Sequence, residues 1–99
     1  MKKLFISQPM RDKSNEEIKR ERERAAEAAR NFLGEEVEII DSFFENAPHD
    51  ARPLWFLGKS LELLSTSDVA YFVKGWEKYR GCRIEHRAAA EYSIQMITE

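Results

Sequence analysis

A continuous apolar segment, Val69–Val73, is the sequence feature that most constrains the fold of this chain. Asp68 precedes the segment, and Lys74 and Gly75 follow it, so polar or turn-forming residues bound it on both sides. Short apolar runs without alternation are typical of parallel strands that are buried on both faces of a sheet. The chain must therefore provide helices that cover both faces, which predicts an α/β layer fold.

Other segments predict the strands and helices that alternate with this run. Leu4–Ile6 is a short apolar run that ends at Ser7-Gln8-Pro9, and Val37–Ile40 has the partial alternation of a strand near a sheet edge. A helix is predicted between Ser14 and Gly34, because Ser14 and Glu17 have the spacing of a capping box and apolar residues recur at helical intervals. Those apolar residues are Ile18, Ala25, Ala26, Ala29, Phe32 and Leu33.

The rest of the chain predicts two further helices and a last strand. The charged stretch Glu16–Arg24 is expected to be a solvated helix face, because its signs alternate. After a loop at 41–51, Pro53 begins a second helix, whose buried stripe is predicted to be Leu54, Leu57, Leu61 and Leu64. A third helix is predicted from Gly81 through Ile84, Ala88 and Tyr92. Ile94–Ile97 would form a strand after a break at Ser93, and a helix that continues to the C-terminus is the alternative.

This alternation of strands and helices predicts a three-layer Rossmann-like or flavodoxin-like fold. We expect about four parallel strands in the order 2-1-3-4, with helices on both faces. Residues 1–99 are expected to form one domain, because a chain of 99 residues rarely supports two hydrophobic cores. Ligands of such sheets bind beyond the carboxyl ends of the strands, where the strand order reverses. The predicted site therefore comprises the loops Ser7–Lys13 and Lys74–Arg80 and the first turn of the third helix.

Composition and missing motifs exclude several classes of function. The formal net charge of −2 is not that of a protein that binds nucleic acid in bulk. Cys82 is the single cysteine, and neither a signal peptide nor a membrane span is visible, so we expect a cytoplasmic protein without a membrane partner. Dinucleotide-binding, P-loop and C-x-x-C motifs are absent. We therefore expect no cofactor and no metal.

Glu85 is the candidate catalytic residue on the predicted third helix. Its neighbours one turn away are Gly81, Cys82, Ala88 and Ala89, which are all small and uncharged. No Lys or Arg is thus placed to pair with this carboxylate, and the small side chains leave room for a ligand. Its place near the helix N-terminus suits a carboxylate whose charge is stabilised by the helix dipole. An ordinary exposed glutamate is the alternative.

Three segments of the chain resemble a known family: Lys3–Met10, Asp68–Trp76 and Gly81–Ala89. They are similar to the nucleoside 2-deoxyribosyltransferase-like superfamily and, within it, to a small family of unknown function. The pattern of that family is roughly I-S-G-P-M, then A-D-x-x-Y-x-x-x-G-W and S-x-G-x-x-x-E-x-x-x-A. The resemblance covers nearly the whole chain. It implies an enzyme that cleaves or exchanges the N-glycosidic bond of a nucleoside or nucleotide, with Glu85 as the nucleophile that forms a covalent glycosyl-enzyme.

The resemblance also implies a substrate site, with departures from the family pattern. The second catalytic aspartate of the relatives falls at Ser60, and the tyrosine that orients their nucleophile falls at Phe5. The Asp or Ser six residues before the nucleophile falls at Tyr79, and Gln8 stands where the small family has glycine. The residues expected to bind substrate are Ser7, Gln8, Pro9, Met10, Asp68, Gly75, Trp76, Tyr79, Arg80 and Gly81.

Three hypotheses about function follow. The first is the N-glycosidic-bond enzyme, in which Trp76 either stacks on a base or packs at the exit of the third strand. The second is a non-catalytic nucleoside- or nucleotide-binding module, because Ser60 has no carboxyl group. The third is an interaction protein whose Trp55 and Phe56 face a partner, although these side chains would also suit packing against the sheet. A homodimer or larger homo-oligomer is expected, because so small a sheet covers its faces poorly and the relatives complete each other's pockets.

Overall fold

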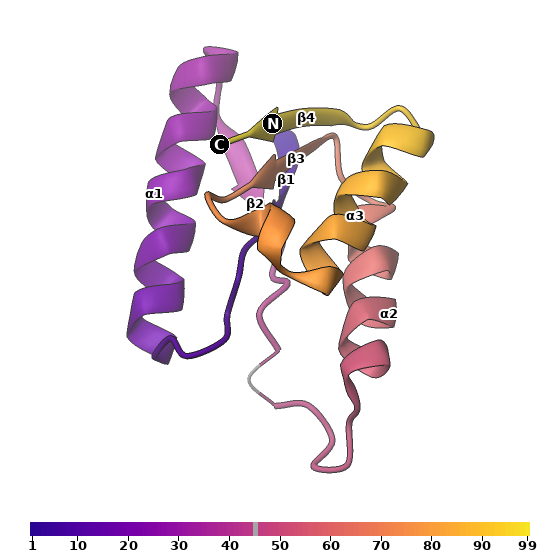
Figure 1. Ribbon diagram of the computed structural model, residues 1–99. Coiled ribbons are helices and arrows are strands. Elements are labelled where there is room, and N and C mark those ends of the chain that lie inside the picture. Colours follow the sequence, from indigo (N-terminus) through magenta and orange to yellow (C-terminus); the bar gives the residue numbers. More distant parts are fainter. Residues whose placement is uncertain (45) are drawn as a thin grey trace.

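The computed structural model describes residues 1–44 and 46–99, and it contains four strands and three α-helices. In chain order the elements are β1 (Lys2–Ser7), α1 (Asn15–Leu33), β2 (Val37–Ile39), α2 (Pro53–Leu64), β3 (Val69–Phe72), a 3-10 turn η1 (Trp76–Lys78), α3 (Arg80–Glu91) and β4 (Gln95–Thr98) (Figure 1). The loop predicted at 41–51 is irregular throughout its described residues, and Glu45 lies outside them.

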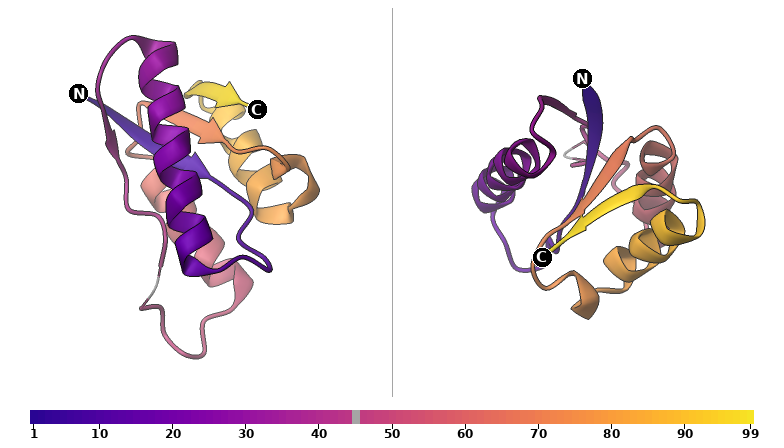
Figure 2. Two further views of the ribbon diagram at one scale, coloured as in Figure 1. Left: turned by 90° about the vertical axis from the view of Figure 1, so that its left-hand side faces the viewer. Right: turned by 90° about the horizontal axis from the view of Figure 1, so that it is seen from above.

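The sheet has the predicted topology. All three strand pairings are parallel and the order is β2-β1-β3-β4, so the predicted order 2-1-3-4 is confirmed. Helix α1 covers one face of the sheet and helices α2 and α3 cover the other, which gives three layers (Figure 2). β1 and β3 lie side by side in the centre although two helices separate them in sequence. The chain therefore diverges to opposite faces after these two strands, as a switch point requires.

The termini of the elements follow local sequence signals. Ser14 caps α1 by accepting a hydrogen bond from the Glu17 backbone, and the Glu17 side chain completes the capping box. Gly34 ends α1 in the left-handed region at φ 71°, where glycine is unstrained. Ser93 has a φ of 58°, which breaks the helix before β4. The alternative of a helix that continues to the C-terminus is therefore wrong.

Several predicted boundaries are off by one residue. β2 ends at Ile39 and β3 at Phe72, one residue earlier than predicted, and α3 begins at Arg80 instead of Gly81. The backbone N–H groups of Ile40 and Val73 still donate to Leu4 and Ser7, so the parallel ladder extends one hydrogen bond past each strand. The last strand is Gln95–Thr98 and not Ile94–Ile97, because Ile94 completes the turn after α3.

Side-chain alternation along the central strands separates two apolar clusters. The cluster under α1 consists of side chains from β1, β2 and β3, of the residue that follows β3, and of the alanine face of the helix. Its members are Leu4, Ile6, Val37, Val69, Tyr71, Val73, Ala25, Ala26 and Ala29. The cluster under α2 and α3 is smaller: Phe5, Ala70, Phe72, Leu64 and Ala89. The run Val69–Val73 is buried along its whole length, which confirms a central strand covered on both faces.

The predicted buried faces of the helices need correction. Phe32 is 69% exposed near the end of α1, whereas the next residue, Leu33, packs against the core. Leu54 is 75% exposed, because the first turns of α2 extend beyond the carboxyl ends of the strands, and only Leu64 of the predicted leucine stripe is fully buried. In α3 the predicted pattern also differs, because Ile84 and Tyr92 are exposed while Cys82, Glu85 and Ala89 form the buried face.

In the described part of the chain, no helix is both long and apolar enough to cross a membrane.

The register of α3 can be tested with two adjacent alanines. Ala89 is fully buried against the sheet, whereas Ala90 is exposed. Leucine at Ala89 would overfill a packed core, so we expect Ala89→Leu to lower the free energy of unfolding by about 1–3 kcal/mol. Ala90→Leu should change it by less than about 0.5 kcal/mol. Urea denaturation of both variants checks this, and equal losses of stability would contradict the helix face described here.

Candidate functional site

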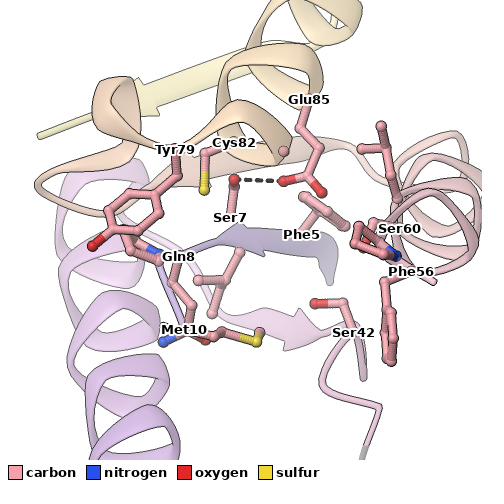
Figure 3. Close-up of a pocket in the computed structure, with 15 residues that line it drawn as sticks. Phe5, Ser7, Gln8, Met10, Ser42, Phe56, Ser60, Tyr79, Cys82 and Glu85 are labelled. Atoms are coloured by element: carbon pink, nitrogen blue, oxygen red, sulfur yellow. Dashed lines mark hydrogen bonds between the residues drawn. The ribbon is translucent and has the colours of Figure 1, made fainter. Parts of the chain in front are cut away.

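A cavity of about 280 Å³ opens beyond the carboxyl end of β1, at the switch point between β1 and β3. This volume is near the lower end of the range for small-molecule sites. Its walls come from β1 and the loop after it, from the first turns of α2, and from the start of α3 (Figure 3). The lining residues are Phe5, Ile6, Ser7, Gln8, Pro9, Met10, Ser42, Pro53, Phe56, Leu57, Ser60, Tyr79, Gly81, Cys82 and Glu85.

Glu85 is a buried carboxylate in this cavity. Its side chain is only 8% exposed, so the alternative of an ordinary exposed glutamate is wrong. The Ser7 hydroxyl donates a hydrogen bond of 2.6 Å to Glu85 Oε1 (Figure 3). Burial raises the pKa of Glu85 above its ordinary value, and hydrogen bonds from Ser7 and Ser60 act in the opposite direction. Desolvation thus outweighs the hydrogen bonds, although the sequence indicated a carboxylate stabilised by the helix dipole.

Strand alternation explains how Ser7 reaches Glu85. Phe5 and Ser7 project to the face of the sheet that α2 and α3 cover, whereas Leu4 and Ile6 project towards α1. Ser7 is the last residue of β1, so its hydroxyl lies where the strand leaves the sheet. Glu85 is placed opposite it by the second turn of α3.

Cys82 lies one turn before Glu85 and also lines the cavity. Burial raises the pKa of the Cys82 thiol to about 11, so the group is a neutral thiol near pH 7. A hydrogen bond with Ser7 lowers this pKa and does not offset the burial. The thiol is therefore a small, uncharged buried group beside the carboxylate.

Six of the ten residues predicted to bind substrate line the cavity: Ser7, Gln8, Pro9, Met10, Tyr79 and Gly81. Asp68 does not, because it precedes β3 and therefore lies at the amino ends of the strands, where its carboxylate accepts a hydrogen bond from the Lys3 backbone at 2.8 Å. Arg80 is exposed at the first turn of α3 and lies outside the lining. The cavity is thus lined by the predicted residues at the end of β1, in the loop after it and at the start of α3. The other predicted residues do not line it.

Trp76 and Gly75 also lie outside the lining. The Trp76 ring stacks on His86, with ring centroids 4.1 Å apart and planes inclined by 11°, and it packs against Phe72. Of the two roles considered for Trp76, the structure shows packing at the exit of β3. Gly75 has a φ of 93°, a left-handed conformation that lets the chain turn sharply after β3.

The three positions that the resemblance singles out beside the nucleophile, Phe5, Ser60 and Tyr79, all line the cavity with Glu85. Ser60 comes from the middle of α2 and faces Glu85 across the cavity (Figure 3). Phe56 adds an aromatic wall one turn earlier in α2. Phe56 also contacts Trp55, with ring centroids 5.1 Å apart, and both rings pack on Phe44 and belong to neither apolar cluster of the sheet.

Arg22 and Ser42 belong to the site region and were not predicted from the sequence. Arg22 is only 7% exposed and donates hydrogen bonds to Gln8 Oε1, to the Ile40 carbonyl and to Ser42 Oγ, at 3.0, 2.9 and 3.1 Å. The expectation that Glu16–Arg24 is wholly solvated is therefore wrong at Arg22. Arg22 shares the helical face of Ile18 and Ala26, four residues before and after it, and this periodicity could have revealed its burial.

Gln8 connects this arginine to the cavity. Its carbonyl oxygen accepts from Arg22, and its amide nitrogen donates to Glu21 Oε1 at 2.9 Å and to the Ile18 carbonyl at 3.3 Å. Lys13 pairs with Glu21 at 3.0 Å. Glutamine at the position where the small family has glycine therefore has a structural role, because it fixes the loop after β1 to α1.

Glu85 is the one carboxylate among the described residues that line the cavity. Within the same described part of the chain, no three His, Cys, Asp or Glu side chains gather in a way that could hold a metal ion. The cavity can therefore offer one buried carboxylate, three hydroxyl groups from serines and a largely apolar wall.

Comparisons of the chain with protein-family models, curated proteins and solved structures give no significant match.

The burial of Glu85 predicts a dependence of stability on pH. Because the folded-state pKa of Glu85 is raised, its stabilising contribution is complete below the unfolded-state pKa and is lost as the pH rises through the folded-state value. The free energy of unfolding of Glu85→Gln should therefore rise relative to that of the wild type from about pH 4 to about pH 8. Urea denaturation across this range measures the difference, and a difference that stays constant would mean that burial does not raise this pKa.

Proposed function

We propose that the cavity binds a nucleoside or nucleotide and that Glu85 attacks the anomeric carbon of its sugar. The observation that supports this most directly is the buried Glu85 carboxylate, which Ser7 orients at 2.6 Å inside a cavity large enough for part of a small ligand. A carboxylate held in a fixed position and shielded from water can act as the nucleophile of a double displacement. The positions singled out by the resemblance converge around it.

The reaction consists of two displacements at one carbon. A Glu85 oxygen forms a bond to the anomeric carbon while the bond from that carbon to the base nitrogen breaks, and the base leaves with the electron pair and takes a proton from water. Water, or the nitrogen of a second base, then attacks the same carbon, the Glu85 carboxylate is released, and a proton is returned to solvent. The Ser7 hydrogen bond holds Glu85 in position through both steps.

The apolar wall of the cavity suits the base of such a substrate. Phe5, Phe56 and Leu57 lie on the side of α2, next to Glu85. An aromatic base can pack on Phe56 in an offset or edge-to-face arrangement. The sequence suggested that Trp76 stacks on the base, but its ring is stacked on His86. In this proposal Phe56 packs on the base instead.

The absence of a second carboxylate from the described lining supports a second candidate, a binding module without turnover. Ser60 faces Glu85 where the relatives have an aspartate, and a serine hydroxyl is too weak an acid to protonate a leaving base efficiently. A general acid typically contributes a rate factor of about 10²–10⁴. The enzyme proposed here is therefore slow with substrates whose base leaves poorly.

Chromatography of nucleosides and their 5′-monophosphates after incubation with the protein tests the proposal. We expect the wild type to release or exchange the base, and Glu85→Ala to lower the rate at least about 1000-fold. Burial raises the pKa of Glu85, so the rate should increase with pH as the carboxylate ionises.

The exposed Glu91 on the same helix provides the matched control, because Glu91→Ala should leave the rate unchanged. Base release that survives Glu85→Ala would contradict the role of Glu85. Binding without base release by the wild type would favour the binding module.

A homodimer or larger homo-oligomer remains part of the proposal. Phe32 and Leu54 are large apolar side chains that stay 69% and 75% exposed in the single chain, and an assembly would cover such surface. Light scattering in solution should give a multiple of 11.6 kDa. A mass equal to that of one chain would contradict this expectation.

A further inference from the structure

Ser7 and Glu85 have the arrangement of a nucleophile and its general base. Ser7 is 2% exposed and Glu85 is 8% exposed, and both residues line the cavity. The Ser7 hydroxyl donates to Glu85 Oε1 at 2.6 Å, a distance at which a carboxylate can remove the proton of a hydroxyl group. In the glycosyl reaction this bond only holds Glu85 in position. It also places the Ser7 proton on a base, so that the serine oxygen itself can attack a ligand.

Ser60 orients the Glu85 carboxylate from a second side. Its hydroxyl contributes a hydrogen bond to Glu85 from the opposite wall of the cavity (Figure 3). A serine nucleophile, a base within hydrogen-bond reach and a third group that orients the base form the usual arrangement around an activated serine. Burial raises the pKa of Glu85, so its ionised carboxylate is a stronger base than an exposed one.

The first turn of α3 brings backbone donors to the same place. Gly81 and Cys82 line the cavity, and among the described residues no acceptor receives a hydrogen bond from either backbone N–H group. Such N–H groups have no partner within a helix and point out of its N-terminal end. A hydrogen bond joins the Cys82 side chain to Ser7, so this turn lies against the serine. The two N–H groups can therefore stabilise the negative oxygen that forms when Ser7 attacks a carbonyl carbon.

The rest of the lining favours an uncharged ligand. None of the described lining residues is Lys, Arg or His, so a negatively charged ligand would find no cationic side chain there. Phe56 and Leu57 form an apolar wall from α2, which suits a hydrocarbon or aromatic part of the ligand. A small uncharged ester has both a carbonyl carbon for Ser7 and an apolar part for this wall.

We propose that the cavity has a second activity, the hydrolysis of uncharged esters of small carboxylic acids, in which Ser7 is the nucleophile and Glu85 its general base. This inference goes beyond the proposed function, because the reaction needs neither a sugar nor a nucleobase. Ser7 and Glu85 are the catalytic residues of the reaction. Ser60 is a positioning residue that acts through Glu85.

The reaction has two halves. Ser7 Oγ forms a bond to the carbonyl carbon while its proton passes to Glu85, and the carbonyl oxygen takes the electron pair of the double bond. The carbonyl then re-forms, the bond to the alcohol oxygen breaks, and the alcohol leaves with the proton from Glu85. Water next attacks the acyl-serine and gives a proton to Glu85. The bond to Ser7 Oγ breaks, the carboxylic acid leaves, and Ser7 recovers its proton from Glu85.

Hydrolysis of p-nitrophenyl acetate, followed by the absorbance of released p-nitrophenolate, tests the proposal. We expect the wild type to be at least about 100-fold faster than Ser7→Ala and Glu85→Gln, because a general base typically contributes a factor of about 10²–10⁴. Ser65→Ala is the matched control and should leave the rate unchanged. Ser65 is an exposed serine at the end of α2 whose hydroxyl bonds the Glu62 carbonyl.

The position of the acyl group can be tested on the wild type alone, so this test does not depend on the folding of a variant. Acid quenching and cleavage after Lys and Arg give the peptide Leu4–Arg11, in which Ser7 has the one hydroxyl group and neither Lys nor Cys is present. We expect one acetyl group on this peptide. Acetylation of other peptides only, or equally fast hydrolysis by Ser7→Ala, would overturn the proposal.

Ser60→Ala tests the positioning role of Ser60. The hydrogen bond from Ser60 lowers the pKa of Glu85, so its loss should raise that pKa. The rate of ester hydrolysis should increase with pH as Glu85 ionises, and the midpoint of this increase should move to higher pH in Ser60→Ala. A lower rate with an unchanged midpoint would overturn this role.

Parallel incubation with nucleosides and their 5′-monophosphates separates the two activities. Ester hydrolysis through Ser7 without release of any nucleobase would support this inference and overturn the proposed function. Nucleobase release without acetylation of Ser7 would overturn this inference and leave the proposed function standing. Absence of both reactions would overturn both.

Discussion

The buried hydrogen bond between Ser7 and Glu85 is the contact on which the site depends. It joins the carboxyl end of the central strand β1 to the second turn of α3, and it forms because strand alternation turns Ser7 to the face that α3 covers. Burial of the Glu85 carboxylate is unfavourable for its charged form. The pKa of Glu85 is therefore raised, because burial outweighs the hydrogen bonds that the carboxylate receives. The buried carboxylate therefore lowers the stability of the fold as the pH rises.

The same alternation divides the end of β1 between the two faces of the sheet. Ser7 turns to α3, while Gln8 turns to α1 and is held there by Arg22 and Glu21. The last residue of β1 and the first residue after it are thereby hydrogen-bonded to the helices on opposite faces of the sheet, and both line the cavity. This division also places Glu85 and Arg22 on opposite faces of the sheet.

The sequence predicts the fold well because its signals are local and agree with one another. The run Val69–Val73 and the capping box at Ser14 each match one element, and the alternation of elements then determines the strand order. The candidate site is predicted in part: Glu85 is found because nothing is placed to pair with it along α3. Arg22 is missed because the alternating charges of Glu16–Arg24 indicate a solvated face, although Arg22 shares the helical face of Ile18 and Ala26 and is held there by Gln8 and Ser42. Trp76 is misplaced because His86, ten residues later, provides its stacking partner.

In the proposed reaction Glu85 becomes covalently bonded to a sugar. Rapid acid quenching of the protein with a nucleoside or nucleotide, followed by intact mass measurement and peptide mapping, detects such a bond. We expect a mass increase of one glycosyl unit, located on the peptide that contains Glu85 and absent from Glu85→Gln. Base release without any adduct, or an adduct on another residue, would contradict it.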